Sequence, residues 1–179
     1  MDTTAASSFL SPDTIEQAVS SLQDLGGAGV PLAGATWISR APVRREALPR
    51  TYVSLAGIPA LHEIRIDARQ ASIGSLATHA QIAGALVGCG DLQALAMAAG
   101  TSATPAIRRV ATIGGNICTT AFSAADLVPP LLALEAQVEV RGEDGLSVQP
   151  IDAFLAQRRN RAHSDLVTRI ILPRTARRS

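Results

Sequence analysis

Hydrophobic residues near the start of the chain recur three and four positions apart, which is the spacing of one face of an α-helix. The apolar positions are Ile15, Ala18, Val19, Leu22 and Leu25. Ser11 followed by Pro12 predicts the start of this helix, and the pair Gly26-Gly27 predicts its end. The pattern therefore predicts an amphipathic helix close to the N-terminus.

Short apolar runs, and runs in which apolar and polar residues alternate, predict β-strands along the rest of the chain. The runs cover residues 30–33, 51–55, 63–67, 71–76, 137–141, 146–149 and 166–172. The turn Gly142-Glu143-Asp144-Gly145 joins two of them into a predicted hairpin. The polar stretch at residues 40–50, which contains two prolines, is predicted to be a loop.

Further helices are predicted between these strands. Thr78 followed by Gln81 is a capping box that predicts a helix over residues 78–87. Asp91 is a predicted cap for a helix at residues 92–99, and Asp126 for one that ends near Leu134. Because helices and hairpins are mixed irregularly, the order favours an α+β fold over a doubly wound parallel sheet.

Two glycine turns carry the candidate chemistry. They are Leu32-Ala33-Gly34-Ala35-Thr36 and Thr112-Ile113-Gly114-Gly115-Asn116. Such turns can present backbone N–H groups to a phosphate without an obstructing side chain, and Thr112 adds a hydroxyl donor. Either turn alone is also compatible with a plain tight turn, and the turn at residues 32–36 is the weaker signal of the two. Their joint occurrence predicts two loops that close on one dinucleotide, although the chain lacks the GxGxxG sequence of a Rossmann fold.

Composition removes several classes of function. All sixteen basic residues are arginine, so a phosphate-binding or Schiff-base lysine is excluded. The net charge of +1 argues against a nucleic-acid-binding protein. Two cysteines, Cys89 and Cys118, are too few to hold an iron–sulfur cluster. No stretch approaches the roughly 20 apolar residues of a membrane span. Residues 1–8 lack a secretory signal, and we expect a cytoplasmic protein.

Several single residues allow two interpretations. Asp126 is either a helix cap or an acceptor for ligand hydroxyls, and Trp37 is either ordinary packing or a wall against a flat ring. Cys118 is either a small buried hydrophobe or a neighbour of the ligand. The histidines His62, His79 and His163 lie in different elements and predict no metal site, and His79 is interpreted as structural.

The arginines are concentrated at the C-terminal end. Seven of them lie between Arg158 and Ser179, where Asp165 is the only acidic residue. This stretch is either a solvated chain end or a docking surface for an acidic partner or a phosphate.

At these motifs the sequence resembles the FAD-binding (medium) subunits of molybdenum hydroxylases, the xanthine dehydrogenase, aldehyde oxidase and carbon monoxide dehydrogenase flavoprotein family. The segments that carry the resemblance are residues 32–36, 73–74, 78–82, 112–116, 124–134 and 166–173. It extends from about Phe9 to Pro173, nearly the whole chain.

The resemblance implies a PCMH-type FAD-binding fold with two lobes, a small α/β lobe at residues 1–57 and a larger mixed α+β lobe at 58–175. FAD would lie between them. The resemblance assigns its contacts to Ala33, Gly34, Ala35, Thr36, Trp37, Thr112, Ile113, Gly114, Gly115, Asn116, Asp126 and Leu166. The first and second loops would hold the pyrophosphate, Asp126 would bind ribityl or ribose hydroxyls, and Leu166 or Val167 would pack on a ring.

The implied function is electron relay within a hetero-oligomeric oxidoreductase. A large subunit would carry molybdopterin and a small subunit two-iron two-sulfur clusters. Electrons would pass through FAD to NAD+, oxygen or a quinone. No catalytic residue and no metal ligand is predicted in this chain.

Three features differ from the family. Ala35 replaces a glycine, which is costly if its φ is positive. The spacing between Asn116 and Asp126 is longer, with Phe122-Ser123 in place of Ser-Pro. Only residues 174–179 follow Pro173 in this sequence, so we expect the usual C-terminal domain to be absent. Two alternatives therefore stay open, an assembly subunit with weakened FAD binding and a stand-alone flavin reductase of the same fold.

Overall fold

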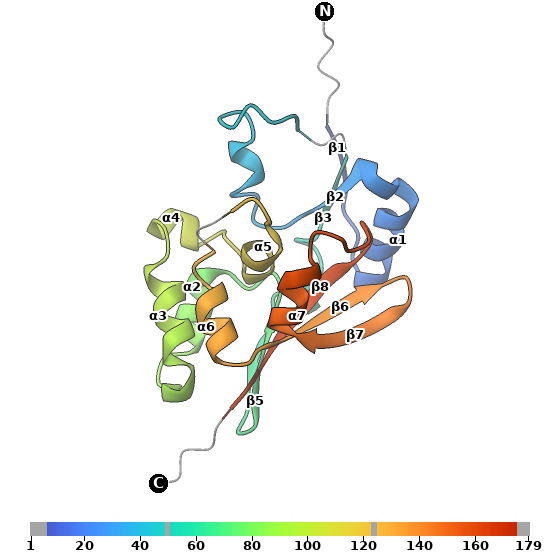
Figure 1. The fold of residues 1–179 in the computed structure, drawn as a ribbon. Helices are drawn as coiled ribbons and strands as arrows, with labels where there is room; N and C mark the ends of the chain where they lie inside the picture. Colours follow the sequence, from blue (N-terminus) through green and yellow to red (C-terminus); the bar gives the residue numbers. More distant parts are fainter. Residues whose placement is uncertain (1–6, 49–50, 123–124, 175–179) are drawn as a thin grey trace, which may run out of the picture.

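The structure, a computed structural model, describes residues 7–48, 51–122 and 125–174 (Figure 1). Ser123 and Ala124, part of the segment with the longer spacing, lie outside the described residues. So do Arg177 and Arg178 of the arginine-rich end and most of the stretch searched for a secretory signal. Two sheets and the helices packed on them form an α+β fold, as the order of elements predicts.

The first sheet has three parallel strands in the order β1-β3-β2. They are β1 (Ser8–Leu10), β2 (Gly29–Leu32) and β3 (Thr51–Ser54). Helix α1 (Ile15–Leu25) joins the first two strands, and Val19 and Leu22 of its apolar face are buried. Thr14 caps this helix by accepting a hydrogen bond from the N–H of Gln17 at 3.1 Å, so the predicted start at Ser11 is wrong.

The second sheet is antiparallel, in the order β4-β5-β8-β6-β7. Its strands are β4 (Ile64–Ile66), β5 (Gln70–Gly74), β6 (Gln137–Gly142), β7 (Gly145–Pro150) and β8 (Leu166–Pro173). The central position of β8 brings the C-terminal strand between two hairpins. The predicted strands and the hairpin through Gly142–Gly145 are thus confirmed.

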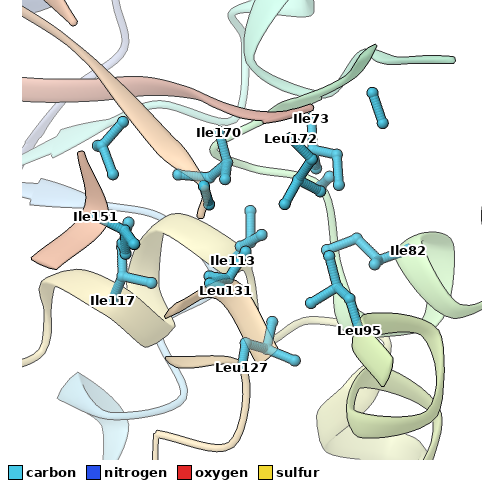
Figure 2. Packing of buried hydrophobic residues seen from close by; sticks show 14 of the residues in the cluster. Ile73, Ile82, Leu95, Ile113, Ile117, Leu127, Leu131, Ile151, Ile170 and Leu172 are labelled. Carbon is cyan, nitrogen blue, oxygen red and sulfur yellow. The ribbon is translucent and has the colours of Figure 1, made fainter. Parts of the chain in front are cut away.

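Short helices cover one face of this second sheet (Figure 1). They are α2 (His79–Ala85), α3 (Gln93–Thr101), α5 (Ile113–Cys118), α6 (Val128–Ala133) and α7 (Ile151–Gln157). A further short helix, α4 (Pro105–Arg108), contacts α2. Figure 2 shows Ile73 and Ile170 of the sheet near Ile113 of α5 and Leu131 of α6. Single turns of 3-10 helix occur at Gly26–Ala28, Ile38–Arg40, Pro59–Leu61 and Gly90–Leu92.

The predicted helix caps have different outcomes. The capping box of Thr78 and Gln81 is present in full. Asp91 does not cap α3, because Leu92 occupies that position; its carboxylate instead pairs with Arg174 at 3.0 Å. Helix α7 and strand β1 were not predicted from the sequence.

A second hydrophobic cluster joins the two sheets. Leu22 of α1 and Val53 of β3 pack with Leu76 and with Leu166 at the start of β8. Because these residues come from both halves of the chain, the two sheets are held together by a shared core. Among the described residues, no helix is long and apolar enough to cross a membrane.

Candidate functional site

A cavity of about 810 Å³ brings together segments that are far apart in the sequence. Its lining comes from residues 31–40, Leu55 and residues 75–79, 102–122, Asp126 and 154–167. Figure 1 shows the segment after β2 on the same side of the molecule as α4 and α5. Eleven of the twelve predicted contact residues line this cavity. The exception is Ile113, which is fully buried in the main hydrophobic core.

The loop after β2 presents free hydrogen-bond donors. Among the residues that the structure describes, none accepts a hydrogen bond from the backbone N–H groups of residues 34–38. All five of these residues line the cavity. Consecutive backbone N–H groups without acceptors form a concave site suited to an anion. This loop therefore has unused backbone donors beside the cavity, in contrast to the second glycine motif.

Gly34 is required by a backbone contact rather than by its own φ angle. A Cβ atom at this position would overlap the carbonyl oxygen of Val110, which precedes the second glycine motif. The missing side chain therefore lets the first loop pack directly on the backbone of Val110 and Ala111. This contact fixes the position of the free N–H groups relative to α5.

Ala35 has a positive φ of 55°. This is the condition under which its methyl group is expected to be costly. Replacing Ala35 with glycine is expected to stabilise the chain by about 0.5–1 kcal/mol. Relief of about 1–2 kcal/mol of left-handed strain exceeds the roughly 0.4–1 kcal/mol that glycine loses in backbone entropy. Urea unfolding measures the change. Ala33→Gly, at a position without positive φ, is the control and should destabilise; equal effects of both variants would contradict this account.

The second glycine motif is a helix rather than a turn with outward N–H groups, so that part of the prediction is wrong. Thr112 caps α5 by accepting a hydrogen bond from the N–H of Gly115 at 3.2 Å. The N–H groups of Ile113 and Gly114 donate to the carbonyl oxygens of Ala77 and Ser75 at 3.1 and 2.9 Å. The N–H of Asn116 donates to the carbonyl of Thr112 at 2.9 Å. The backbone donors of this motif are therefore used within the protein.

The two glycines of α5 have different roles. A Cβ on Gly114 would lie 2.8 Å from the Ser75 carbonyl oxygen, so this glycine permits close packing of α5 against the end of β5. A Cβ on Gly115 would meet only the Thr112 hydroxyl, at 3.0 Å. Because Gly115 also lines the cavity, a side chain at this position would occupy space available to a ligand.

Asp126 is not a helix cap. Leu127 occupies the cap position of α6 without a side-chain hydrogen bond, and Asp126 is exposed at the cavity. The amide oxygen of Asn116, which is buried, accepts a hydrogen bond from the N–H of Leu127 at 3.3 Å. Asn116 therefore fixes the segment next to Asp126, and the carboxylate of Asp126 is left available as an acceptor.

Trp37 forms one wall of the cavity between two neighbours. The Arg44 guanidinium lies 3.9 Å from the centre of its ring, and the Phe122 ring centre lies at 5.3 Å on a tilted plane. Arg44 also donates to the Trp37 carbonyl at 3.0 Å. Cys118 lines the cavity and is exposed as a residue, while burial raises the pKa of its thiol to about 12. Leu166 is buried in the second core cluster and reaches the cavity from the start of β8.

Three arginines after α7 line the cavity; the sequence placed them in a possible docking surface for an acidic partner or a phosphate, but not among the FAD contacts. Arg158 and Arg159 donate to the carbonyls of Ile117 and Thr120, and Arg161 pairs with Asp165 at 3.0 Å. They hold the chain that follows α5 against the chain that precedes β8. The cluster of arginines in the sequence was their only signal.

Two further residues of the lining, Ser75 and His79, were also missed. The Ser75 hydroxyl and the Nε2 atom of His79 are buried and have no partner among the described residues. Unpartnered buried polar atoms are costly unless a ligand or water satisfies them. Sequence reasoning interpreted His79 as structural because its position in the first turn of a helix is all that the sequence reveals.

Comparison with known proteins identifies related chains. The family described as "FAD binding domain in molybdopterin dehydrogenase" matches residues 5–175. The xanthine dehydrogenase FAD-binding subunit of Escherichia coli O157:H7 is 42% identical over 82 residues, 46% of this chain and 28% of the relative. The nicotinate dehydrogenase FAD-subunit of Eubacterium barkeri is 29% identical over 174 residues, 93% of this chain and 58% of the relative.

Solved structures agree with these matches. A carbon monoxide dehydrogenase chain from Hydrogenophaga pseudoflava superposes with a TM-score of 0.85 at 24% identity, over 96% of this chain and 60% of that chain. This likeness shows the shared fold. Together, the matches confirm the resemblance inferred from the motifs and the predicted fold class. The chain spans between about a quarter and three-fifths of the relatives it matches.

Proposed function

Because the chain belongs to the family of FAD-binding domains of molybdopterin dehydrogenases, we propose that it binds FAD and relays electrons within an oxidoreductase complex. The electrons would come from iron–sulfur clusters of a partner subunit and leave to NAD+, oxygen or a quinone. The names of the relatives, FAD subunits of xanthine and nicotinate dehydrogenases, support this proposal.

The observation that carries the FAD site is the row of backbone N–H groups at residues 34–38, which line the cavity and have no acceptor among the described residues. A pyrophosphate is an anion with many acceptor oxygens, and such a row of donors suits it. The exposed Asp126 carboxylate suits hydroxyl groups, and the apolar side chain of Leu166 suits a ring. The cavity thus offers groups for each chemical part of FAD.

In this proposal the chain's own residues bind and orient the cofactor, and FAD supplies the redox chemistry when bound. We assign residues 1–57 and 58–175 to two lobes that hold FAD between them. An iron–sulfur subunit and a molybdopterin subunit are the proposed partners, in a cytoplasmic hetero-oligomer. No nucleic acid takes part. These assignments follow the family resemblance and stay predictions.

A ligand series tests the phosphate site. We expect FAD to bind at least about 100-fold more tightly than riboflavin, since a pyrophosphate adds charge-assisted hydrogen bonds worth about 1.5–3 kcal/mol each. ADP, which shares the pyrophosphate, should compete with FAD. Quenching of Trp37, the single tryptophan of the chain, gives the readout because its side chain lines the cavity. Equal affinities for FAD and riboflavin would contradict recognition by the loop.

A further inference from the structure

His79 is held in the wall of the cavity by three separate elements. It is the first residue of α2, and its backbone N–H donates to the Ala111 carbonyl at 2.9 Å. Its Nδ1 atom lies 2.7 Å from the hydroxyl of Ser102, at the end of α3. The backbone of His79 is therefore fixed at Ala111, and its side chain at Ser102. Only 3% of the residue is exposed.

The hydrogen-bond pattern sets the tautomer of this imidazole. We assign Nδ1–H of His79 as the donor to the Ser102 oxygen, because that hydroxyl has the Ala99 carbonyl as its own acceptor at 3.3 Å. A neutral imidazole that is protonated on Nδ1 carries a bare lone pair on Nε2. That Nε2 atom is buried without a partner in the described part of the chain, and the residue lines the cavity.

The surroundings favour this neutral form. Burial is the main cause that lowers the pKa of His79 below its ordinary value of 6.5. The Asp126 carboxylate acts in the opposite direction, and the Arg108 guanidinium lowers the pKa further. Arg108 is itself fixed, because it donates to the carbonyls of Ser102 and Ala103. At neutral pH, Nε2 is therefore an acceptor that lacks a donor.

We propose that Nε2 of His79 accepts a hydrogen bond from a sugar or ribityl hydroxyl of the FAD bound in this cavity, so that His79 is a ligand-binding residue. This inference rests on the proposed function. A phosphate oxygen is excluded as the partner because it is itself an acceptor at neutral pH, and two acceptors do not bond. The Ser75 hydroxyl is a second buried polar atom of the lining without a partner among the described residues.

Two substitutions of His79 separate a hydrogen bond from simple packing. His79→Leu removes the acceptor, and we expect the Kd for FAD to rise about tenfold, the effect of one lost hydrogen bond to a buried group. His79→Gln keeps an acceptor near the position of Nε2, and its Kd should stay within about threefold of the unchanged chain. Quenching of Trp37 measures both, and thermal unfolding identifies any variant that is not folded. Equal losses in both folded variants would overturn the proposal.

The pH dependence gives an independent measurement. Protonation turns Nε2 into a donor, so FAD affinity should be constant above pH 6.5 and fall as the pH drops through the lowered pKa of His79. In His79→Gln this decrease should disappear. If His79→Leu does not fold, the pH profiles of the unchanged chain and of His79→Gln still test the proposal. Affinity that rises at low pH, or a profile unchanged by His79→Gln, would overturn the proposal.

The same titrations distinguish a ribose hydroxyl from a ribityl hydroxyl. They also separate the role of His79 from FAD binding itself. If His79→Leu loses as much affinity for ADP as for FAD, the hydroxyl lies on the ribose. If it loses affinity for FAD alone, the hydroxyl lies on the ribityl chain. If the chain without any substitution binds neither FAD nor ADP, the proposed function itself is refuted. Normal FAD binding by both the unchanged chain and His79→Leu would refute only the role of His79.

Discussion

Replacing Gly115 with valine should abolish FAD binding, with a loss of at least about 100-fold in affinity, while the chain stays folded. Gly115 lies in the wall of the cavity, and an added Cβ meets only the Thr112 hydroxyl at 3.0 Å. The branched side chain would therefore extend into space that the ligand needs. The cause is steric, because the N–H of Gly115 already bonds to Thr112.

Gly84→Val is a matched control for this substitution. Gly84 also lies in a helix, α2, but it is exposed, outside the cavity lining, and has no atom within 4 Å of an added Cβ. Both variants carry the cost of a β-branched residue in a helix. Circular dichroism and quenching of Trp37 should show two folded proteins, of which only Gly84→Val binds FAD. Unchanged FAD affinity in Gly115→Val would contradict the position of the ligand.

Replacing Gly34 with alanine should destabilise the chain by about 3 kcal/mol and weaken FAD binding at the same time. The new methyl group would overlap the Val110 carbonyl oxygen, a backbone atom that cannot rotate away. The loop must then separate from Val110 and Ala111, and the free N–H groups of residues 34–38 move with it. Urea unfolding, followed by circular dichroism, gives the change in free energy.

Gly57→Ala is the control for the Gly34 substitution. Gly57 also lies outside helices and strands and has no positive φ, and its added Cβ would meet the Pro12 carbonyl at an ordinary 3.5 Å. We expect its stability to change by less than about 1 kcal/mol. A Gly34→Ala chain as stable as the Gly57→Ala chain would show that the close contact between the two loops is wrong.

The strands were predictable because their signals are local. Alternation at β6 and β7 and the turn Gly142–Gly145 define a hairpin without information from the rest of the chain. The same holds for Thr78 and Gln81, whose reciprocal bonds span three residues. Where a pattern determines its own partner, the sequence is sufficient to predict the element.

Helix α5 was missed because distant residues stabilise it. Two adjacent glycines disfavour a helix by intrinsic propensity. Here the N–H groups of Ile113 and Gly114 donate to carbonyls of Ala77 and Ser75, and Ile113 is buried in the core. These tertiary contacts outweigh the propensity of the glycines. The glycine at position 114 is therefore explained by close packing against Ser75 rather than by a turn.

The sequence predicted backbone donors in the first glycine loop, but the path of that loop and the surroundings of His79 were beyond sequence reasoning for a similar reason. The free donors at residues 34–38 depend on a backbone path in which Ala35 has a positive φ, which alanine seldom adopts. The bond between His79 and Ser102 joins residues 23 positions apart in two helices. No local pattern relates them, so the unpartnered Nε2 atom becomes visible only in the folded chain.

The visible absorption spectrum of the purified chain tests the central claim most directly. We predict flavin bands near ~450 nm that survive desalting after FAD is added, with about one FAD per chain. A folded chain that is colourless after this treatment, with unquenched Trp37, would contradict FAD binding by this cavity. In that case the strain at Ala35 would favour the alternative of an assembly subunit that has lost the cofactor.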